Sequence, residues 1–174
     1  MKMIAFTGLK GSAKTTAALY LEEQHGYKRI NFKDSLIDEL ESNFPKLLDE
    51  LSLLYGIKKG ELFIEKPILV RRLIQEYGTD VRRKDDKNYW VKRWKEKVIS
   101  SGYERIVVDD VRFLNEAEAV NDLGGTIIEI ARDNIYDGDT HISETEMRMI
   151  TPSVKIFNDK DINSLYNKLE ELNL

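Results

Sequence analysis

Cysteine is absent from the 174-residue sequence, which excludes disulfide bonds, thiol catalysis and zinc–thiolate sites. No apolar run approaches the ~20 residues of a membrane-spanning helix, and the N-terminus lacks the charged-then-apolar order of a signal peptide. The two histidines, His25 and His141, have no partners at metal-binding spacing, so we interpret them as structural. These absences favour a cytoplasmic protein.

A strong excess of charge of one sign is also missing. The chain has 27 basic and 31 acidic residues and a net charge of −4, which argues against a general surface for nucleic-acid polymers or membranes. Hydrophobic residues make up 41 % of the sequence, as is ordinary for a globular protein, and the length suits a single domain over residues 1–174. A phosphorylated ligand would therefore need a local basic pocket.

Apolar runs of strand length alternate with helical patterns along the chain. This alternation predicts an α/β fold of three layers, with a five-stranded, mostly parallel sheet flanked by helices. The expected strands are an apolar run that ends at Gly8 and residues 27–32, 105–109, 126–131 and 153–157. Helical patterns cover residues 15–22, a stretch capped by Asp34 or Ser35, and residues 47–54, 67–77, 89–100, 115–123 and 161–172, with a stop at Gly78 and a loop at 58–66.

Two stretches depart from simple alternation. A helical insertion, residues 34–102, separates the second and third expected strands and is long enough to form a second wall over a phosphate site. Residues 132–142 are polar, as expected of a mobile flap, and residues 143–146 resemble the start of a short helix. We expect residues 132–146 to form a lid.

The most informative motif follows the first expected strand. Against the pattern G-x-x-x-x-G-K-S/T, Gly8, Lys14 and Thr15 match, whereas Ala13 stands where the second glycine belongs. Backbone N–H groups and a helix N-terminus in such a loop bind phosphate oxygens, the lysine adds positive charge, and the hydroxyl can hold Mg²⁺. An ordinary strand–turn–helix is the alternative, but the order of strand, loop and helix favours a phosphate loop. The predicted nucleotide-binding residues are Gly8, Lys10, Gly11, Ser12, Ala13, Lys14, Thr15 and Thr16.

Two carboxylates, Asp109 and Asp110, follow the third expected strand at its carboxyl end, where open α/β sheets bind ligands. In nucleotide enzymes such an aspartate holds Mg²⁺, usually through water, so Thr15 and Asp109 are the predicted metal ligands. Arg112 lies two positions further and suits bidentate phosphate contacts, with Glu116 one helical turn beyond. The alternatives are a strand end that caps a helix and a surface Arg–Glu pair.

Basic, amide and aromatic side chains gather within the insertion. Residues 71–83 carry arginines, a glutamine and Gly78-Thr79, and Trp90 follows. Amide and hydroxyl groups can recognise a base edge, arginines can bind a phosphate, and an aromatic ring can stack on a base. The alternative is an amphipathic helix with a charged rim and a core tryptophan, for which Trp94 is the better candidate.

Four motifs occur in order over nearly the whole chain: G-x-K-x-S-x-K-x-T from Gly8, Q-x-x-G-T from Gln75 with Trp90 downstream, D-x-R-x-x-x-E from Asp110, and Arg132 followed by H-x-S-E. Together they resemble the bacteriophage deoxynucleoside monophosphate kinases. The resemblance implies a P-loop nucleoside monophosphate kinase fold, ATP and Mg²⁺ as cofactors, and transfer of the γ-phosphoryl of ATP to a deoxynucleoside monophosphate. The catalytic residues that it implies are Lys14, Arg112 and Arg132, and the substrate-binding residues are Lys10, Phe32, Arg72, Gln75, Gly78, Thr79, Arg83, Trp90, Asp110, Arg112 and Glu116.

The resulting hypothesis is in-line transfer dominated by positioning and electrostatics, without a covalent intermediate or a required general base. One departure bears on ATP affinity, because Ala13 has a Cβ where glycine is usual. A kinase for a ribonucleotide, a nucleoside or phosphomevalonate is the nearest alternative. A non-catalytic nucleotide-binding switch is another alternative, and Ala13 is the only residue that favours it. A homodimer, and the host cytoplasm if the gene is a phage's, are further expectations.

Overall fold

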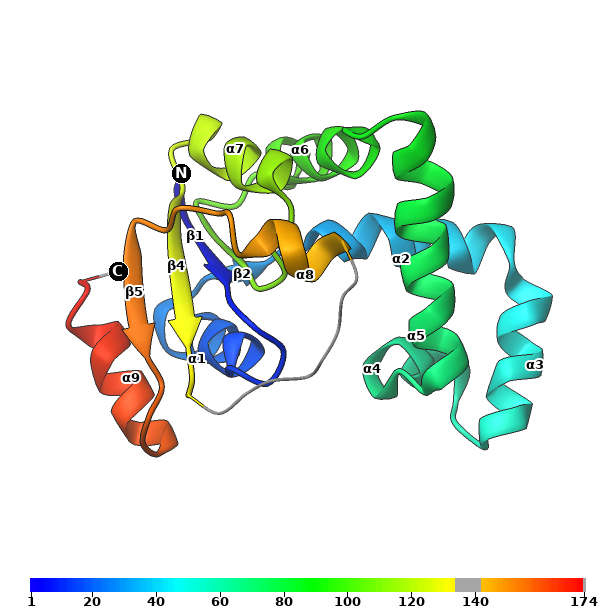
Figure 1. The fold of residues 1–174 in the computed structure, drawn as a ribbon, viewed down its shortest axis with the longest axis horizontal. Helices are drawn as coiled ribbons and strands as arrows, with labels where there is room; N and C mark the ends of the chain where they lie inside the picture. The colour runs from blue at the N-terminus through cyan, green and yellow to red at the C-terminus, as the bar shows by residue number, and fades with distance from the viewer. Residues whose placement is uncertain (134–141, 174) are drawn as a thin grey trace. The chain divides into compact units, whose positions relative to one another are not determined.

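The computed structural model describes residues 1–133 and 142–173. The five strands of its sheet are parallel and lie in the order β2-β3-β1-β4-β5, which confirms the predicted α/β fold (Figure 1). Their bounds are β1 (Lys2–Thr7), β2 (Lys28–Arg29), β3 (Arg105–Val108), β4 (Thr126–Ala131) and β5 (Val154–Phe157).

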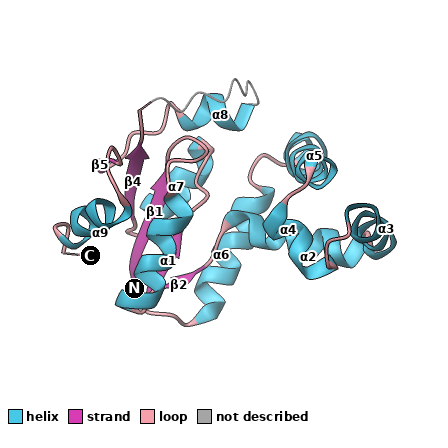
Figure 2. Cartoon of the chain, turned by 90° about the horizontal axis from the view of Figure 1, so that it is seen from below, coloured by secondary structure: helices cyan, strands magenta, loops and turns pink. Residues whose placement is uncertain are grey.

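Helices cover both faces of the sheet, as three layers require (Figures 1 and 2). Helices α1 (Lys14–His25) and α9 (Ile162–Glu170) share one core with alternate strand residues such as Phe6 and Ile128. Helices α7 (Leu114–Asp122) and α8 (Ile142–Met147) and the later part of α6 (Tyr89–Ser101) cover the opposite face, where right-handed crossover connections place them. None of the described helices is both long and apolar enough to cross a membrane.

The chain divides into two compact units. The first comprises Met1–Phe32 and Trp94–Leu174 and contains the sheet, and the second comprises Lys33–Arg93. The expected insertion, residues 34–102, contains nearly all of the second unit and also the part of α6 that belongs with the sheet. The second unit contains α2 (Phe32–Asn43) from its second residue, α3 (Pro45–Tyr55), a 3₁₀ turn (Lys59–Glu61), α4 (Leu62–Glu65), α5 (Ile68–Gln75), the π-helix η2 (Glu76–Arg83) and the start of α6.

Two expected boundaries around the second strand and the 58–66 stretch were wrong. The strand stops at Arg29 and α2 already begins at Phe32, so neither Asp34 nor Ser35 caps this helix. Residues 58–66 contain the 3₁₀ turn and α4 instead of a loop, because Leu62 and Phe63 are buried in the core of the second unit. Of the three apolar residues in this stretch, Leu62 and Phe63 are buried and Ile64 is exposed.

The helix expected to stop at Gly78 continues as η2 to Arg83. Gly78 has no positive φ, and a Cβ at this position would lie 2.6 Å from Leu36 Cδ1. This glycine therefore allows η2 and α2 to pack closely, and it does not end a helix.

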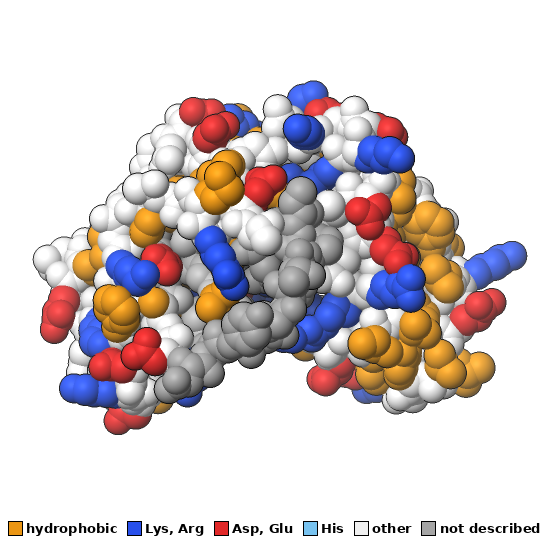
Figure 3. Space-filling view, in the orientation of Figure 1, with side chains coloured by type: hydrophobic (Ala, Val, Ile, Leu, Met, Phe, Trp, Pro, Cys, Tyr) orange, Lys and Arg blue, Asp and Glu red, His pale blue; other side chains and the backbone are white. Residues whose placement is uncertain are grey.

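Apolar side chains of the second unit also reach its surface. Figure 3 shows them gathered over α3, α4 and α5, and the most exposed are Leu53, Leu54, Ile64 and Ile68. The opposite faces of these helices supply the core that contains Leu48, Leu62 and Val70. Each of the three helices is therefore apolar on more than its buried face.

The packing of α7 on β1 and β4 predicts the effect of adding one methyl group. A Cβ on Gly125 would lie 2.6 Å from Val120 Cγ1 and 3.1 Å from Met3 Sδ, so Gly125→Ala should lower the free energy of unfolding by about 1–3 kcal/mol. Gly60→Ala is the matched control, because its Cβ would meet no atom within 4 Å. Urea unfolding measures both variants, and equal stability of the two would contradict the packing described.

Candidate functional site

The loop between β1 and α1 is folded around the side chain of Lys14. Its Nζ donates hydrogen bonds to the carbonyls of Gly8 and Leu9, at 2.7 and 2.8 Å, and the side chain is buried. Gly8 has a φ of +132°, and a Cβ there would overlap the Ile130 carbonyl of β4. The sequence therefore places glycine where the loop approaches the sheet, and the lysine ammonium inside the loop.

Ala13, the departure from the motif, adopts a left-handed conformation with φ 80° and ψ 27° at the N-cap of α1. For a residue with a Cβ this conformation costs roughly 1–2 kcal/mol. The costly backbone expected at this position is thus present.

The strand-end carboxylates lie beside this loop. Because Ala5 pairs with Val108 in the parallel sheet, Asp109 emerges at the same edge as the loop after β1. Thr7 Oγ1 donates a buried hydrogen bond of 3.1 Å to the Val111 carbonyl, which joins the two segments directly. Asp109 is 2 % exposed, and its Oδ2 lies 3.8 Å from Arg29 Nη1.

Asp110 contacts the start of the next helix. Its Oδ1 accepts a 3.0 Å hydrogen bond from the backbone N–H of Phe32, the first residue of α2. The neighbouring Asn31 holds the same edge, since its Oδ1 accepts the backbone N–H of Asp109 at 2.8 Å. Within the first unit, residues 31 and 32 are therefore joined to the strand-end segment by two side chains.

Glu116 caps α7, a different role from the substrate contact expected of it. It is 3 % exposed, and its Oε2 accepts the backbone N–H groups of Arg112 and Phe113 at 2.8 and 3.1 Å. Glu116, in the first turn of α7, thus holds the backbone of Arg112 four positions before it. The first N–H groups of a helix have no partner within the helix, and a carboxylate there is also favoured by the helix dipole.

Arg132 follows β4 and is exposed, with Nη1 3.5 Å from the Gly11 carbonyl of the loop. Of the expected lid, residues 134–141, including His141, lie outside the described part of the chain. The backbone is helical from Ile142, and Glu146 Oε2 accepts the backbone N–H of Leu114 at 3.3 Å. The end of the expected lid is thereby attached to the start of α7.

The remaining expected residues belong to the second unit. Gln75, Thr79 and Arg83 are half-buried along α5 and η2. Arg72 is exposed, and its Nε donates to Glu76 Oε1 at 2.6 Å. The structure places these side chains on consecutive turns of one helical segment.

Both tryptophans belong to cores, so the core role expected of Trp94 is confirmed. Trp94 is fully buried, donates its indole N–H to the Ile30 carbonyl at 3.0 Å and stacks on Phe32. Trp90 is only 2 % exposed and donates its indole N–H to the Gly78 carbonyl at 2.8 Å. The indole hydrogen bond of Trp90 holds Gly78 in place. Because the ring is buried, it has no free face for base stacking.

Sequence reasoning missed a polar cluster around Glu39 of α2. Its carboxylate accepts hydrogen bonds from the Tyr77 hydroxyl at 2.6 Å, the Tyr89 hydroxyl at 2.7 Å and Arg82 Nη2. Arg93 Nη2 lies 3.7 Å from Glu39 Oε2. The only sequence signal was an acidic residue three positions after Leu36 on the apolar side of α2. The cluster borders a polar hollow of about 370 Å³, lined by Ser35, Asp38, Glu39, Ser42, Asn43, Arg82, Tyr89 and Arg93.

The surroundings of Glu39 alter its pKa. Burial raises the pKa of this carboxyl, but hydrogen bonds from Tyr77, Tyr89 and Arg82 lower it by more, so the pKa lies below its ordinary value. The hydrogen bond that Arg82 donates to Glu39 correspondingly raises the pKa of Arg82. Glu39 is therefore ionised and stabilises α2, η2 and α6 together.

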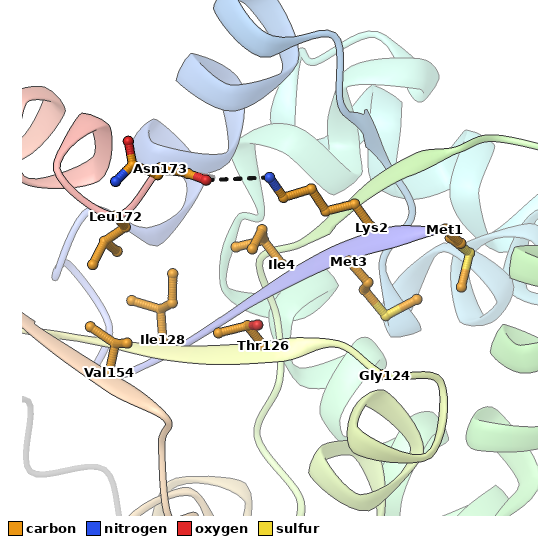
Figure 4. Close-up of a pocket in the computed structure, with 10 residues that line it drawn as sticks. All are labelled: Met1, Lys2, Met3, Ile4, Gly124, Thr126, Ile128, Val154, Leu172 and Asn173. Carbon is orange, nitrogen blue, oxygen red and sulfur yellow. Dashed lines mark hydrogen bonds between the residues drawn. The ribbon is translucent and has the colours of Figure 1, made fainter.

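Another hollow, of about 560 Å³, lies at the opposite end of the strands. Figure 4 shows Ile4, Ile128 and Val154 along it, with Lys2 reaching the Asn173 carbonyl at 3.4 Å. Its lining comes from the early residues of β1, β4 and β5, together with Met1, Gly124, Leu172 and Asn173. It is therefore separate from the loop edge, where parallel strands bind ligands.

Comparison with known proteins decides the family. Residues 46–169, more than half of the chain, match the family model described as deoxynucleotide monophosphate kinase. The chain belongs to the deoxynucleotide monophosphate kinase family. Membership in this family makes it a phosphotransferase that acts on nucleotides, and the predicted resemblance is confirmed.

Two relatives illustrate the match. A protein of Acanthamoeba polyphaga mimivirus with the provisional name deoxynucleotide monophosphate kinase is 32 % identical, over 97 % of this chain and 94 % of its own length. The deoxynucleotide monophosphate kinase of Enterobacteria phage T4 is 33 % identical over 62 % of this chain. The aligned part covers only 46 % of the T4 enzyme, so this chain corresponds to less than half of that relative.

Solved structures support the fold. A Thermus thermophilus protein is 17 % identical over 98 % of this chain and 95 % of its own, with a TM-score of 0.53. A sugar kinase from Janibacter is 13 % identical over 99 % of this chain and 95 % of its own, with a TM-score of 0.51. The expected three-layer kinase fold is therefore confirmed.

The Glu39 cluster predicts how stability depends on pH. Because the pKa of folded Glu39 lies below its ordinary value of 4.5, the ionised form contributes stability that is present above that pH and lost as the pH falls through the folded pKa. Glu39→Gln should thus lower the free energy of unfolding by about 1–3 kcal/mol at pH 7 and by progressively less below pH 4.5.

The measurement is urea unfolding followed by tryptophan fluorescence at several pH values. Glu41→Gln, at an exposed position of the same helix, is the matched control and should have little effect. A Glu39→Gln effect that stays constant from neutral to acid pH would mean that the charge of Glu39 is not what stabilises the unit.

Proposed function

We propose that this chain transfers the γ-phosphoryl group of ATP to a deoxynucleoside monophosphate and produces a deoxynucleoside diphosphate and ADP. The observation that carries the proposal is the direct attachment of the loop after β1 to the Asp109–Arg112 segment through Thr7 and Val111. The loop after β1 suits a nucleoside triphosphate, and the Asp109–Arg112 segment suits the phosphate of an acceptor. Family membership supports the substrate class.

The donor nucleotide would bind at the loop formed by residues 8–16. The first N–H groups of α1 and the loop would surround the phosphates, as helix N-termini do for anions. Lys14 would exchange its hydrogen bonds to the loop carbonyls for phosphate oxygens. Arg132, beside the Gly11 carbonyl, would add positive charge on the side of β4.

Magnesium is implied by the family, and the donor set suits it. Thr15 offers an exposed hydroxyl in the first turn of α1, and Asp109 offers carboxylate oxygens at the strand edge. Mg²⁺ prefers such oxygen ligands and usually takes one or two from protein, with phosphates and water completing its shell. When bound, it would neutralise charge on the phosphates. The described residues contain no group of three or more acidic or histidine side chains that could hold a metal alone.

The acceptor phosphate would bind to Arg112. Glu116 fixes the backbone of that residue, and a guanidinium can hold two phosphate oxygens at once. For the rest of the acceptor, Gln75, Thr79 and Arg83 stay predictions from the resemblance, and within the second unit Trp90 positions Gly78. Lys14, Arg112 and Arg132 would share the charge of the transferring group, and positioning would supply most of the rate.

The reaction is tested with a panel of acceptors in the presence of ATP and Mg²⁺. We expect at least one of dGMP, dTMP and dCMP to accelerate ADP release, with much less acceleration by ribonucleotides, nucleosides or phosphomevalonate. Lys14→Ala should lower kcat about 100-fold, because removal of a fixed charge at the transferred group has effects of this size.

Lys155→Ala, at an exposed lysine of β5, is the matched control and should retain the native rate. If no deoxynucleoside monophosphate accelerates ADP release while ATP binds tightly, the non-catalytic nucleotide switch becomes the better description. If another acceptor reacts fastest, the proposed substrate class is wrong.

The role of Arg112 gives a second prediction. Arg112→Ala should raise KM for the deoxynucleoside monophosphate about 10- to 100-fold and change KM for ATP much less, because a charged hydrogen bond to the acceptor is lost. Steady-state kinetics with each substrate varied in turn provides the measurement. Arg105→Ala, at the other end of β3, is the control. Equal effects on both KM values would contradict the assignment.

A cytoplasmic location, in the host if the gene is a phage's, and a homodimer both remain proposals. The exposed leucines and isoleucines of α3, α4 and α5 are the apolar surface that favours self-association. Sedimentation at several protein concentrations tests it.

A further inference from the structure

Asn158, directly after β5, contacts the phosphate loop across a separation of 146 residues. Its Nδ2 donates a buried hydrogen bond of 3.1 Å to the Ser12 carbonyl. Its own backbone N–H donates to the Ala131 carbonyl at 2.7 Å, and the side chain is 7 % exposed. Asn158 is therefore fixed to the sheet and has an amide directed at the loop.

The Ser12 carbonyl belongs to the peptide unit that joins Ser12 to Ala13. In a trans peptide the C=O and N–H groups point in opposite directions. A donor that holds the Ser12 oxygen thus also fixes the direction of the Ala13 N–H, which points away from Asn158. The Ser12 hydroxyl is buried without a hydrogen-bond partner among the described residues, so it does not share this task.

Ala13 makes this fixation necessary. Its left-handed conformation is unfavourable for a residue with a Cβ, so without an anchor the peptide would gain by rotating out of it. Glycine at the same position populates the left-handed region without that cost. The anchor therefore matters more in this sequence than it would beside a glycine.

We propose that Asn158 is a positioning residue of the donor-nucleotide site: its amide holds the Ser12–Ala13 peptide in the orientation that binds phosphate, and thereby allows alanine at position 13. This inference rests on the proposed binding of ATP at the loop and extends it to a residue at the far end of the chain.

The test is a double-mutant cycle on the full chain with Asn158→Ala, Ala13→Gly and the double variant. In the native background, Asn158→Ala should raise KM for ATP about tenfold and leave KM for the deoxynucleoside monophosphate, at saturating ATP, within about twofold. In the Ala13→Gly background, the same substitution should raise KM for ATP by no more than about threefold. Asn158→Asp keeps the side-chain shape but lacks the amide donor, and it should behave like Asn158→Ala.

Ile156→Val is the matched control, because it removes one buried methylene from the strand before Asn158 and no hydrogen-bond donor. It should leave the ratio of the two KM values unchanged. Equal increases of both KM values in Asn158→Ala, or lower thermal stability alone, would show a merely structural role. Equal effects of Asn158→Ala in both backgrounds would overturn the link to Ala13.

Failure of the proposed function is recognised separately. If the native chain turns over no deoxynucleoside monophosphate, calorimetric titration of ATP into the same variants still measures the dissociation constants. The same coupled pattern, about tenfold beside alanine and at most threefold beside glycine, would then support the anchor, and its absence would overturn it.

Discussion

Because β1 and β3 run parallel and pair in register from Lys2–Arg105 to Ala5–Val108, the segments that follow them must emerge at one edge of the sheet. The hydrogen bond from Thr7 to the Val111 carbonyl closes the gap between these segments. The loop that suits a phosphate donor and the arginine that suits an acceptor phosphate thus come together through strand pairing and this hydrogen bond. Every other feature of the site refines this arrangement.

Helix starts are the next constraint. Helices α1, α2 and α7 begin at or next to these segments. Asp110 and Glu146 accept the first backbone N–H groups of α2 and α7, and Glu116 accepts the two N–H groups just before α7. The start of α1 has no such carboxylate in its first turn. The helix that carries Lys14 therefore keeps its positive end for an anion, whereas the other two are occupied by the protein itself. This difference resolves how a chain of net charge −4 can offer a local site for phosphate.

The sheet and the loop could be predicted because their signals are local. Buried strands appear as apolar runs in the sequence. Gly8, Lys14 and Thr15 belong to one continuous loop and to the helix start that follows it. The π-helix η2 could not be predicted, because Gly78 permits close packing on Leu36 and this contact depends on a residue 42 positions away. Glu39 was missed for the same reason, since its partners Tyr77, Arg82 and Tyr89 come from distant elements. Trp90 was predicted to stack on a base, whereas the fold of the second unit buries its ring.

Ala13 shows that a sequence motif can specify a backbone conformation that more than one residue type can adopt. A phosphate loop binds anions with backbone N–H groups, so the requirement at this position is a peptide orientation and not a glycine as such. Glycine meets the requirement at low cost, and alanine meets it only where other contacts hold the backbone. Here Lys14 donates hydrogen bonds to the first carbonyls of the loop, and Asn158, directly after β5, donates one to the Ser12 carbonyl near its end. The last strand of the sheet thereby takes part in a site that the first strand begins, which gives a physical reason for a kinase loop without its second glycine.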